Sequence, residues 1–204
     1  SMAEYTAIAD VSETLLGVLR DRIEGRADVA SLGPDSVSLV DPDAVEADSG
    51  TRLSLSLYRI EENASLANTD VNRTGDPSVQ QEPPLALDLY YLVTAHSAGT
   101  GEDATGRTIA QQRLLGLAMQ TFHDNAVLSG DRLGASFDET AELQVSLVDT
   151  GIDERSALWS RLPETALTPS AIYHVGPVLV DSRRREEISP VTDRETDLSR
   201  HSDS

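Results

Sequence analysis

The sequence predicts an α+β fold, in which a mainly antiparallel, mixed sheet carries two long helices packed largely on one face. Two segments, residues 6–24 and 107–128, have apolar side chains at the three- and four-residue spacing of a helix. A third segment, residues 83–96, alternates apolar and mixed positions like a long strand. Long strands that neighbour one another along the chain, with only a few helices between them, fit an α+β sheet.

The long strand is expected to be the centre of the sheet. Six of its side chains share one apolar face, namely Leu85, Leu87, Leu89, Tyr91, Val93 and Ala95. The other face is mixed, since Asp88, Tyr90 and Thr94 lie there with Ala86 and Leu92. Pro83 and Pro84 end the preceding loop, because proline lacks the N–H group that a central ladder needs. Asp88 is expected to form a structural ion pair with an arginine or an interface contact, rather than to act as a catalytic acid.

The first half of the chain supplies one helix and two further strands. Thr6 can cap the helix over 6–24 and Gly25 can end it. Residues 37–40 predict a short strand. Residues 52–60 alternate leucine with serine and tyrosine, which predicts a half-buried strand. The polar stretch 61–81 shows no period and is expected to be a long loop, which in a compact domain is usually functional or disordered.

The second half of the chain supplies the other long helix and two strands. The helix over 107–128 has a broad apolar arc that includes Leu128, and it is expected to pack on both the sheet and another element or subunit. Strands are expected over 143–147 and 170–181, and a short helix with Trp159 over 153–161. Within the last strand, Pro177 requires a bulge or an edge position.

The chain is therefore expected to contain one domain, residues 1–181, and a polar C-terminal arm, residues 182–204. The arm has few large apolar side chains and the composition of a segment that orders only against a partner.

The charge of the chain excludes one class of partner. Thirty-five acidic residues oppose 16 basic ones, all of them arginine, and the net charge is −19. This balance argues against nucleic acid as a partner, because binding to phosphates needs a basic surface. It favours a halophilic cytoplasm, where molar salt shortens the Debye length to roughly 3 Å and makes self-repulsion tolerable; codon bias in a high-GC genome is the alternative. The chain has no cysteine, no leader and no apolar run long enough to span a membrane, so no membrane association is expected.

No motif in the sequence predicts an enzyme. The four histidines lack metal-binding spacing, and a lysine-free chain has no P-loop. The acidic stretch with Asp41, Asp43, Glu46 and Asp48 lacks the glycine and the closing glutamate of a calcium loop. We therefore expect no catalytic, cofactor-binding or metal-binding residue. An acidic, metal-dependent soluble enzyme and a monomeric adaptor remain as alternatives.

Several segments together resemble the N-terminal domain of the cap, or tail-terminator, proteins of contractile injection systems and phage-tail-like particles. The segments that carry the resemblance are Ile8–Val11, Leu55–Asn63, Pro83–Ala95, Leu114–Met119, Trp159 with Leu162-Pro163, and the strand around Tyr173. They cover about residues 4–182, and the proline–leucine strand is the most specific of them.

The resemblance implies a tail-terminator-like fold and a structural role without catalysis. It implies a homohexameric ring that ends the inner tube and ties down the distal sheath, with the tube protein and the sheath protein as partners. Such a protein would assemble in the cytoplasm and then become part of a tail-like particle or virion. The residues expected at its interfaces are Glu61, Asn63, Leu66, Asn68, Arg183, Arg184 and Arg185.

Overall fold

The fold of the chain is seen in a computed structural model. The structure describes residues 5–24, 32–46, 49–67, 79–81, 84–97, 103–130, 132–160, 168–181 and 185–187. These residues form a six-stranded sheet in the order β1-β2-β4-β7-β6-β5, and a separate two-stranded sheet of β3 and β8. The strands are β1 (Val37–Leu39), β2 (Leu53–Glu62), β3 (Val79–Gln81), β4 (Leu85–Ala95), β5 (Val127–Ser129), β6 (Glu142–Leu147), β7 (Ser170–Val180) and β8 (Arg185–Glu187).

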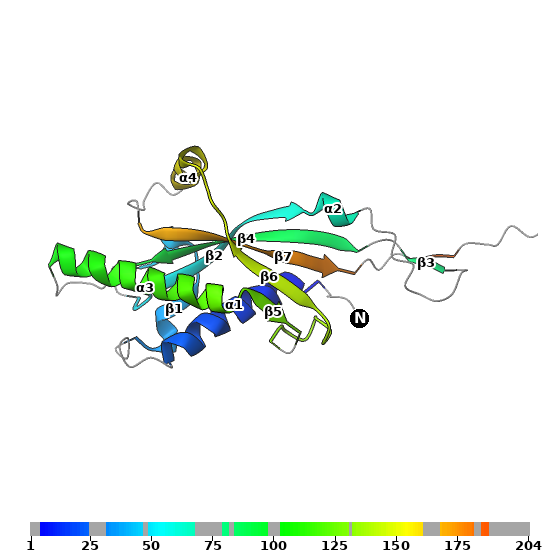
Figure 1. The fold of residues 1–204 in the computed structure, drawn as a ribbon, viewed down its shortest axis with the longest axis horizontal. Coiled ribbons are helices and arrows are strands. Elements are labelled where there is room, and N and C mark those ends of the chain that lie inside the picture. Colours follow the sequence, from blue (N-terminus) through cyan, green and yellow to red (C-terminus); the bar gives the residue numbers. More distant parts are fainter. Residues whose placement is uncertain are drawn as a thin grey trace, which may run out of the picture.

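Helices α1 (Ala7–Glu24) and α3 (Ala104–Asp124) lie on one face of the main sheet, as predicted, and α4 (Ile152–Trp159) lies on the other side (Figure 1). The short helix α2 (Ala64–Ala67) follows β2 at one end of the sheet. Among the described strands, β1 and β2 pair in parallel and the other pairs are antiparallel. The predicted α+β class is therefore confirmed.

Strand β4 lies at the centre of the sheet, between β2 and β7. Its apolar face is buried under α1 and α3, as the alternation predicted. Leu89, Tyr91 and Val93 are fully buried, whereas Leu85 at the start of the strand is 47% exposed. The Tyr91 hydroxyl and the Ser12 hydroxyl lie 2.8 Å apart, which ties α1 to the sheet, and burial raises the pKa of Tyr91 to about 12.

Helix α1 is held at its start by a polar contact as well as by its apolar stripe. The carboxylate of Asp10 accepts hydrogen bonds from the N–H and the hydroxyl of Ser136, in the loop between β5 and β6. A Cβ atom on Gly134 would lie 2.5 Å from the Asp10 carboxyl carbon, so only glycine allows this close approach. The contact fixes the loop against the helix.

The second long helix is shifted from its predicted position. It begins at Ala104, where the Asp103 side chain accepts a hydrogen bond from the Gly106 N–H at 2.8 Å. It ends at Asp124, so the prediction of helix to residue 128 was wrong. Leu128 belongs instead to β5, where it pairs with Leu143 and is buried. Pairing with β6 thus decided the conformation of a segment whose apolar spacing also fits a helix.

Strand β2 is buried on both faces near its start, which corrects the half-buried prediction. Ser54 and Ser56 lie on the face away from α1 and are both buried. The Ser54 hydroxyl lies 2.8 Å from Nε2 of His96, and the Ser56 hydroxyl donates to the Asp41 carboxylate. Burial, aided by the charge of Arg52, lowers the pKa of His96. Hydrogen bonding thus allows serine to occupy an interior position.

The long stretch 61–81 is partly ordered rather than a loop throughout, because β2 continues to Glu62 and α2 and β3 follow. Pro177 lies where the pairing of β7 with β4 shifts its register, so the predicted bulge is confirmed. The start of the polar arm forms β8, which pairs with β3.

Replacing Leu89 by alanine should lower the free energy of unfolding by about 2–5 kcal/mol, because the side chain is fully buried and leaves a cavity. Leu85 is on the same face of the same strand but is 47% exposed, so Leu85→Ala is the matched control and should cost far less. Chemical denaturation of the two variants measures the difference. Equal losses would contradict the assignment of β4 as the core strand.

Candidate interaction surface

The sheet face opposite α1 and α3 carries a cluster of charged and aromatic side chains at one end. We call it the sheet-face cluster, and its members are Arg59, Glu61, Asn63, Asp88, Tyr90 and His174. The register of the sheet brings them together, because Tyr90 of β4 lies opposite Arg59 of β2 and His174 of β7. Glu61 lies opposite Asp88 in the same way.

Asp88 is the centre of the cluster. Its carboxylate accepts hydrogen bonds from the Asn63 side-chain amide at 3.1 and 3.3 Å, and Nε2 of His174 lies 2.9 Å from Oδ1. The Asp88 and His174 side chains are 18% and 26% exposed. Asp88 therefore pairs with a histidine, and the expectation of an arginine partner was wrong. The β4–β7 register decides the pairing, because it places His174 beside Asp88.

Arg59 and Tyr90 form the aromatic part of the cluster. The Arg59 guanidinium carbon lies 3.8 Å from the centroid of the Tyr90 ring, a cation–π contact worth about 0.5–1 kcal/mol at an exposed site. Nε of Arg59 also lies 3.6 Å from the Glu61 carboxylate. The pKa of Tyr90 is raised, first by burial and then by the negative charge of Glu61. The side chains thus hold one another in fixed positions on the open face of the sheet.

The cluster does not have the geometry of an activated nucleophile. Ser146 lies on the other side of His174 from Asp88, but its hydroxyl is 3.5 Å from Nδ1 and the residue is exposed. Nucleophile and base are normally 2.6–3.2 Å apart. Arginine and tyrosine are instead the residues that dominate binding energy in protein interfaces. The arrangement therefore fits a binding surface.

Some of the predicted interface residues lie in or beside the sheet-face cluster, and the others lie elsewhere or outside the described residues. Glu61 and Asn63 belong to the cluster, and Leu66 lies beside it in α2, half-buried. Asn68, Arg183 and Arg184 lie outside the described residues, and the backbone of Arg185 pairs with Gln81.

Sequence reasoning missed Arg59, Tyr90 and His174. The mixed face of β4 in the sequence was a signal for Tyr90. Arg59 and Glu61 are two residues apart on β2, so their side chains share one face of that strand. His174 could be placed only from the β4–β7 register.

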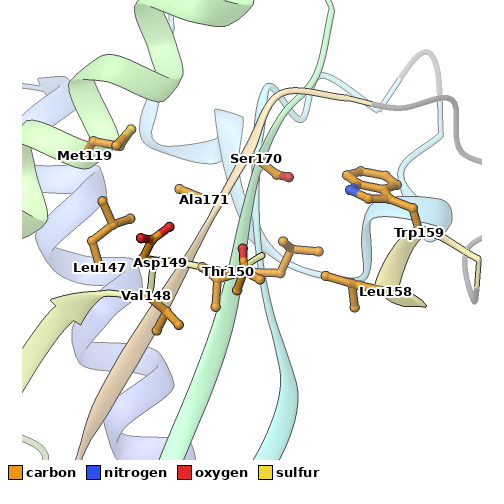
Figure 2. A pocket seen from close by; sticks show the side chains of 11 residues that line it. Met119, Leu147, Val148, Asp149, Thr150, Leu158, Trp159, Ser170 and Ala171 are labelled. Carbon is orange, nitrogen blue, oxygen red and sulfur yellow. The ribbon is translucent and has the colours of Figure 1, made fainter. Parts of the chain in front are cut away.

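A separate small pocket lies where β6 and β7 diverge before α4 (Figure 2). Its volume is about 260 Å³, below the range of about 300–1,000 Å³ for sites of small ligands. Its lining is mostly apolar and includes Leu147, Leu158 and Trp159, with Asp149 among the polar members. Asp149 is the one ionisable side chain among the residues that line it.

Two features of the described residues bear on other functions. In this part of the chain, no group of three or more histidine, aspartate or glutamate side chains could hold a metal ion. None of the helices seen here is both long enough and apolar enough to cross a membrane.

Replacing Gly176 by alanine should disrupt the cluster, because the new Cβ would lie 2.7 Å from Oδ1 of Asp88. The expected result is a changed NMR signal of the His174 imidazole and a loss of stability. The control is Gly116→Ala, at an open position of α3, which should leave His174 unchanged and stabilise the protein by about 0.5–1 kcal/mol. An unchanged His174 signal in the Gly176 variant would contradict the proximity of Asp88.

A family model and two solved structures of terminator or cap proteins match this chain. Residues 10–194 match the model of the Pvc16 N-terminal domain. No curated protein matches the chain. The sheath/tube terminator of the extracellular contractile injection system PVC, in its extended state, has a similar structure, with a TM-score of 0.61 and 16% identity over 96% of this chain and 64% of that chain.

The cap of the anti-feeding prophage also matches, with a TM-score of 0.45 and 18% identity over 70% of this chain and 48% of that chain. The chain thus spans less than two thirds of either structure. The family model, by contrast, covers most of this chain. The chain belongs to the family defined by the Pvc16 N-terminal domain.

Proposed function

We propose that this protein is the structural cap of a contractile injection system or phage-like tail. It forms a homohexameric ring that ends the inner tube and anchors the distal sheath. The family match over residues 10–194 carries the proposal, and the fold shared with a sheath/tube terminator supports it. The protein assembles in the cytoplasm, becomes part of the particle, and acts without catalysis.

Contacts between identical subunits must overcome the charge of the chain. Each copy carries −19, so opposed surfaces of like charge would repel. Arg183, Arg184 and Arg185 open the C-terminal arm and are the densest positive charge in the sequence. A guanidinium group binds a carboxylate through two parallel hydrogen bonds, which suits pairing with an acidic neighbour. We assign the contact with the sheath to the part of this arm that follows β8, residues 188–204.

The sheet-face cluster supplies a second contact surface. It is preorganised by the Asp88–His174 and Arg59–Tyr90 contacts, so little side-chain freedom is lost when a partner binds. Glu61 and Leu66 at its margin are available to a neighbouring subunit. These are the residues that we propose for the interfaces, together with Asn63 and Asn68.

Replacing Arg183, Arg184 and Arg185 together by alanine should abolish particle assembly while leaving the monomer folded. Electron microscopy of particles and circular dichroism of the purified variant measure the two effects. Arg113→Ala, at an exposed position of α3, is the control and should assemble normally. Normal particles from the triple variant would contradict the role of the arm.

A halophilic origin, which we also propose, predicts that salt stabilises the protein. Raising KCl from about 0.1 M to about 1 M shortens the Debye length from about 10 Å to about 3 Å and screens the repulsion among 35 acidic residues. The thermal midpoint should therefore rise over this range, with sucrose as a control for non-ionic effects. A midpoint that stays constant with KCl would favour codon bias as the origin of the composition.

If the protein were instead a metal-dependent enzyme, the purified protein should contain metal and be a monomer. Metal analysis and mass measurement of the purified protein, with imaging of native particles, separate the two functions. A metal-loaded monomer found free of tail components would contradict the cap function.

A further inference from the structure

Half of β2 has an open edge. The strand runs from Leu53 to Glu62, but β1 pairs only with its first three residues, 53–55. From Leu57 onward, no described strand pairs with β2 on the side away from β4. Ile60 in this half is 48% exposed. An exposed strand edge is a template on which another chain can add a strand, and proteins normally protect it.

The hydrogen bonds of β2 show which backbone groups face outward. The Asn63 N–H donates to the Ala86 carbonyl at 2.8 Å, so Asn63 directs its backbone toward β4. In an antiparallel pair, successive residues of a strand direct their backbone N–H and C=O groups alternately toward the partner strand and away from it. Arg59 and Glu61 therefore also face β4, and Ile60 and Glu62 present N–H and C=O groups at the open edge.

The ribbon of β3 and β8 is the part of the chain best suited to meet this edge. It consists of three residue pairs, 79–81 with 185–187, and is separate from the main sheet. It extends beyond the end of the sheet at which α2 follows β2 (Figure 1). A two-stranded ribbon is at best marginally stable alone. Both its outer edges lack a strand partner among the described residues.

We propose that the β3–β8 ribbon of one subunit adds to the open edge of β2, residues 57–62, in the next subunit. Ribbon and edge are different surfaces, so the contact is head-to-tail and can repeat around a closed ring. Strand addition gains affinity from backbone hydrogen bonds, so it does not require side chains of opposite charge on two copies of a chain of net charge −19. The inference rests on the proposed cap function, because it names how the ring is joined.

A proline at position 60 tests the open edge. Ile60→Pro removes the outward N–H and places a ring there, while the bonds of Arg59 and Glu61 to β4 remain. Ile60→Thr is the control, since it removes the same apolar side chain but keeps the N–H group. We expect native mass spectrometry and electron microscopy to show rings for the wild type and the threonine variant and none for the proline variant. Circular dichroism and thermal melting check that both variants fold.

Disulfide cross-linking tests where the ribbon binds. Because the chain has no cysteine of its own, only the introduced cysteines can form the link. A Glu62→Cys protein is mixed with proteins that carry a distinguishing tag and cysteine at one ribbon position, in β3 (Val79, Gln80 or Gln81) or in β8 (Arg185, Glu186 or Glu187). Oxidation should link the two proteins at one or more of these positions, since paired strands bring Cα atoms within disulfide range. Gln112→Cys, exposed on α3, is the control and should not link.

The outcomes separate this inference from the function on which it rests. Rings that form with Ile60→Pro, or rings in which no ribbon position links to Glu62→Cys, overturn the strand addition and leave the cap function intact. A wild-type protein that forms no rings and is missing from purified particles overturns the cap function as well.

Discussion

The rest of the structure depends on the pairing of β4 with β2 on one side and β7 on the other. These two antiparallel pairings run almost the full length of the strand. They align Leu89, Tyr91 and Val93 with the apolar faces of β2 and β7, which creates the surface that α1 and α3 bury. The same pairings align Arg59, Tyr90 and His174 on the opposite face. One register thus determines both the core and the sheet-face cluster.

The two faces of the sheet therefore have different roles. One face is closed by helices and supplies the hydrophobic stabilisation of the domain. The other face is covered only in part. Near the end of β4 it buries Leu92, Ser54 and Thr94, and nearer the start of β4 it presents the cluster. This division would leave the second face free for a neighbour in the ring that we propose.

The open edge of β2 and the ribbon lie at the same end of the molecule as the cluster. If the ribbon of a neighbour adds to residues 57–62, it lies beside Arg59 and Glu61, which are already fixed by Tyr90 and by each other. The backbone groups of the β2 edge and the side chains of the cluster would then contact the same neighbour. Their combination would give a chain of net charge −19 a way to associate with copies of itself, as we propose.

The sequence by itself determined the helix over α1, the long strand β4 and the α+β class, because each rests on a local period of apolar residues. It also carried the resemblance to tail terminators. Only the tertiary structure decided that Leu128 enters a strand, that Ser54 and Ser56 are buried, and that Asp88 meets His174. These features depend on pairing between residues far apart in the chain, for which no local pattern exists. The interaction surface belongs to this second group, since a strand register creates it.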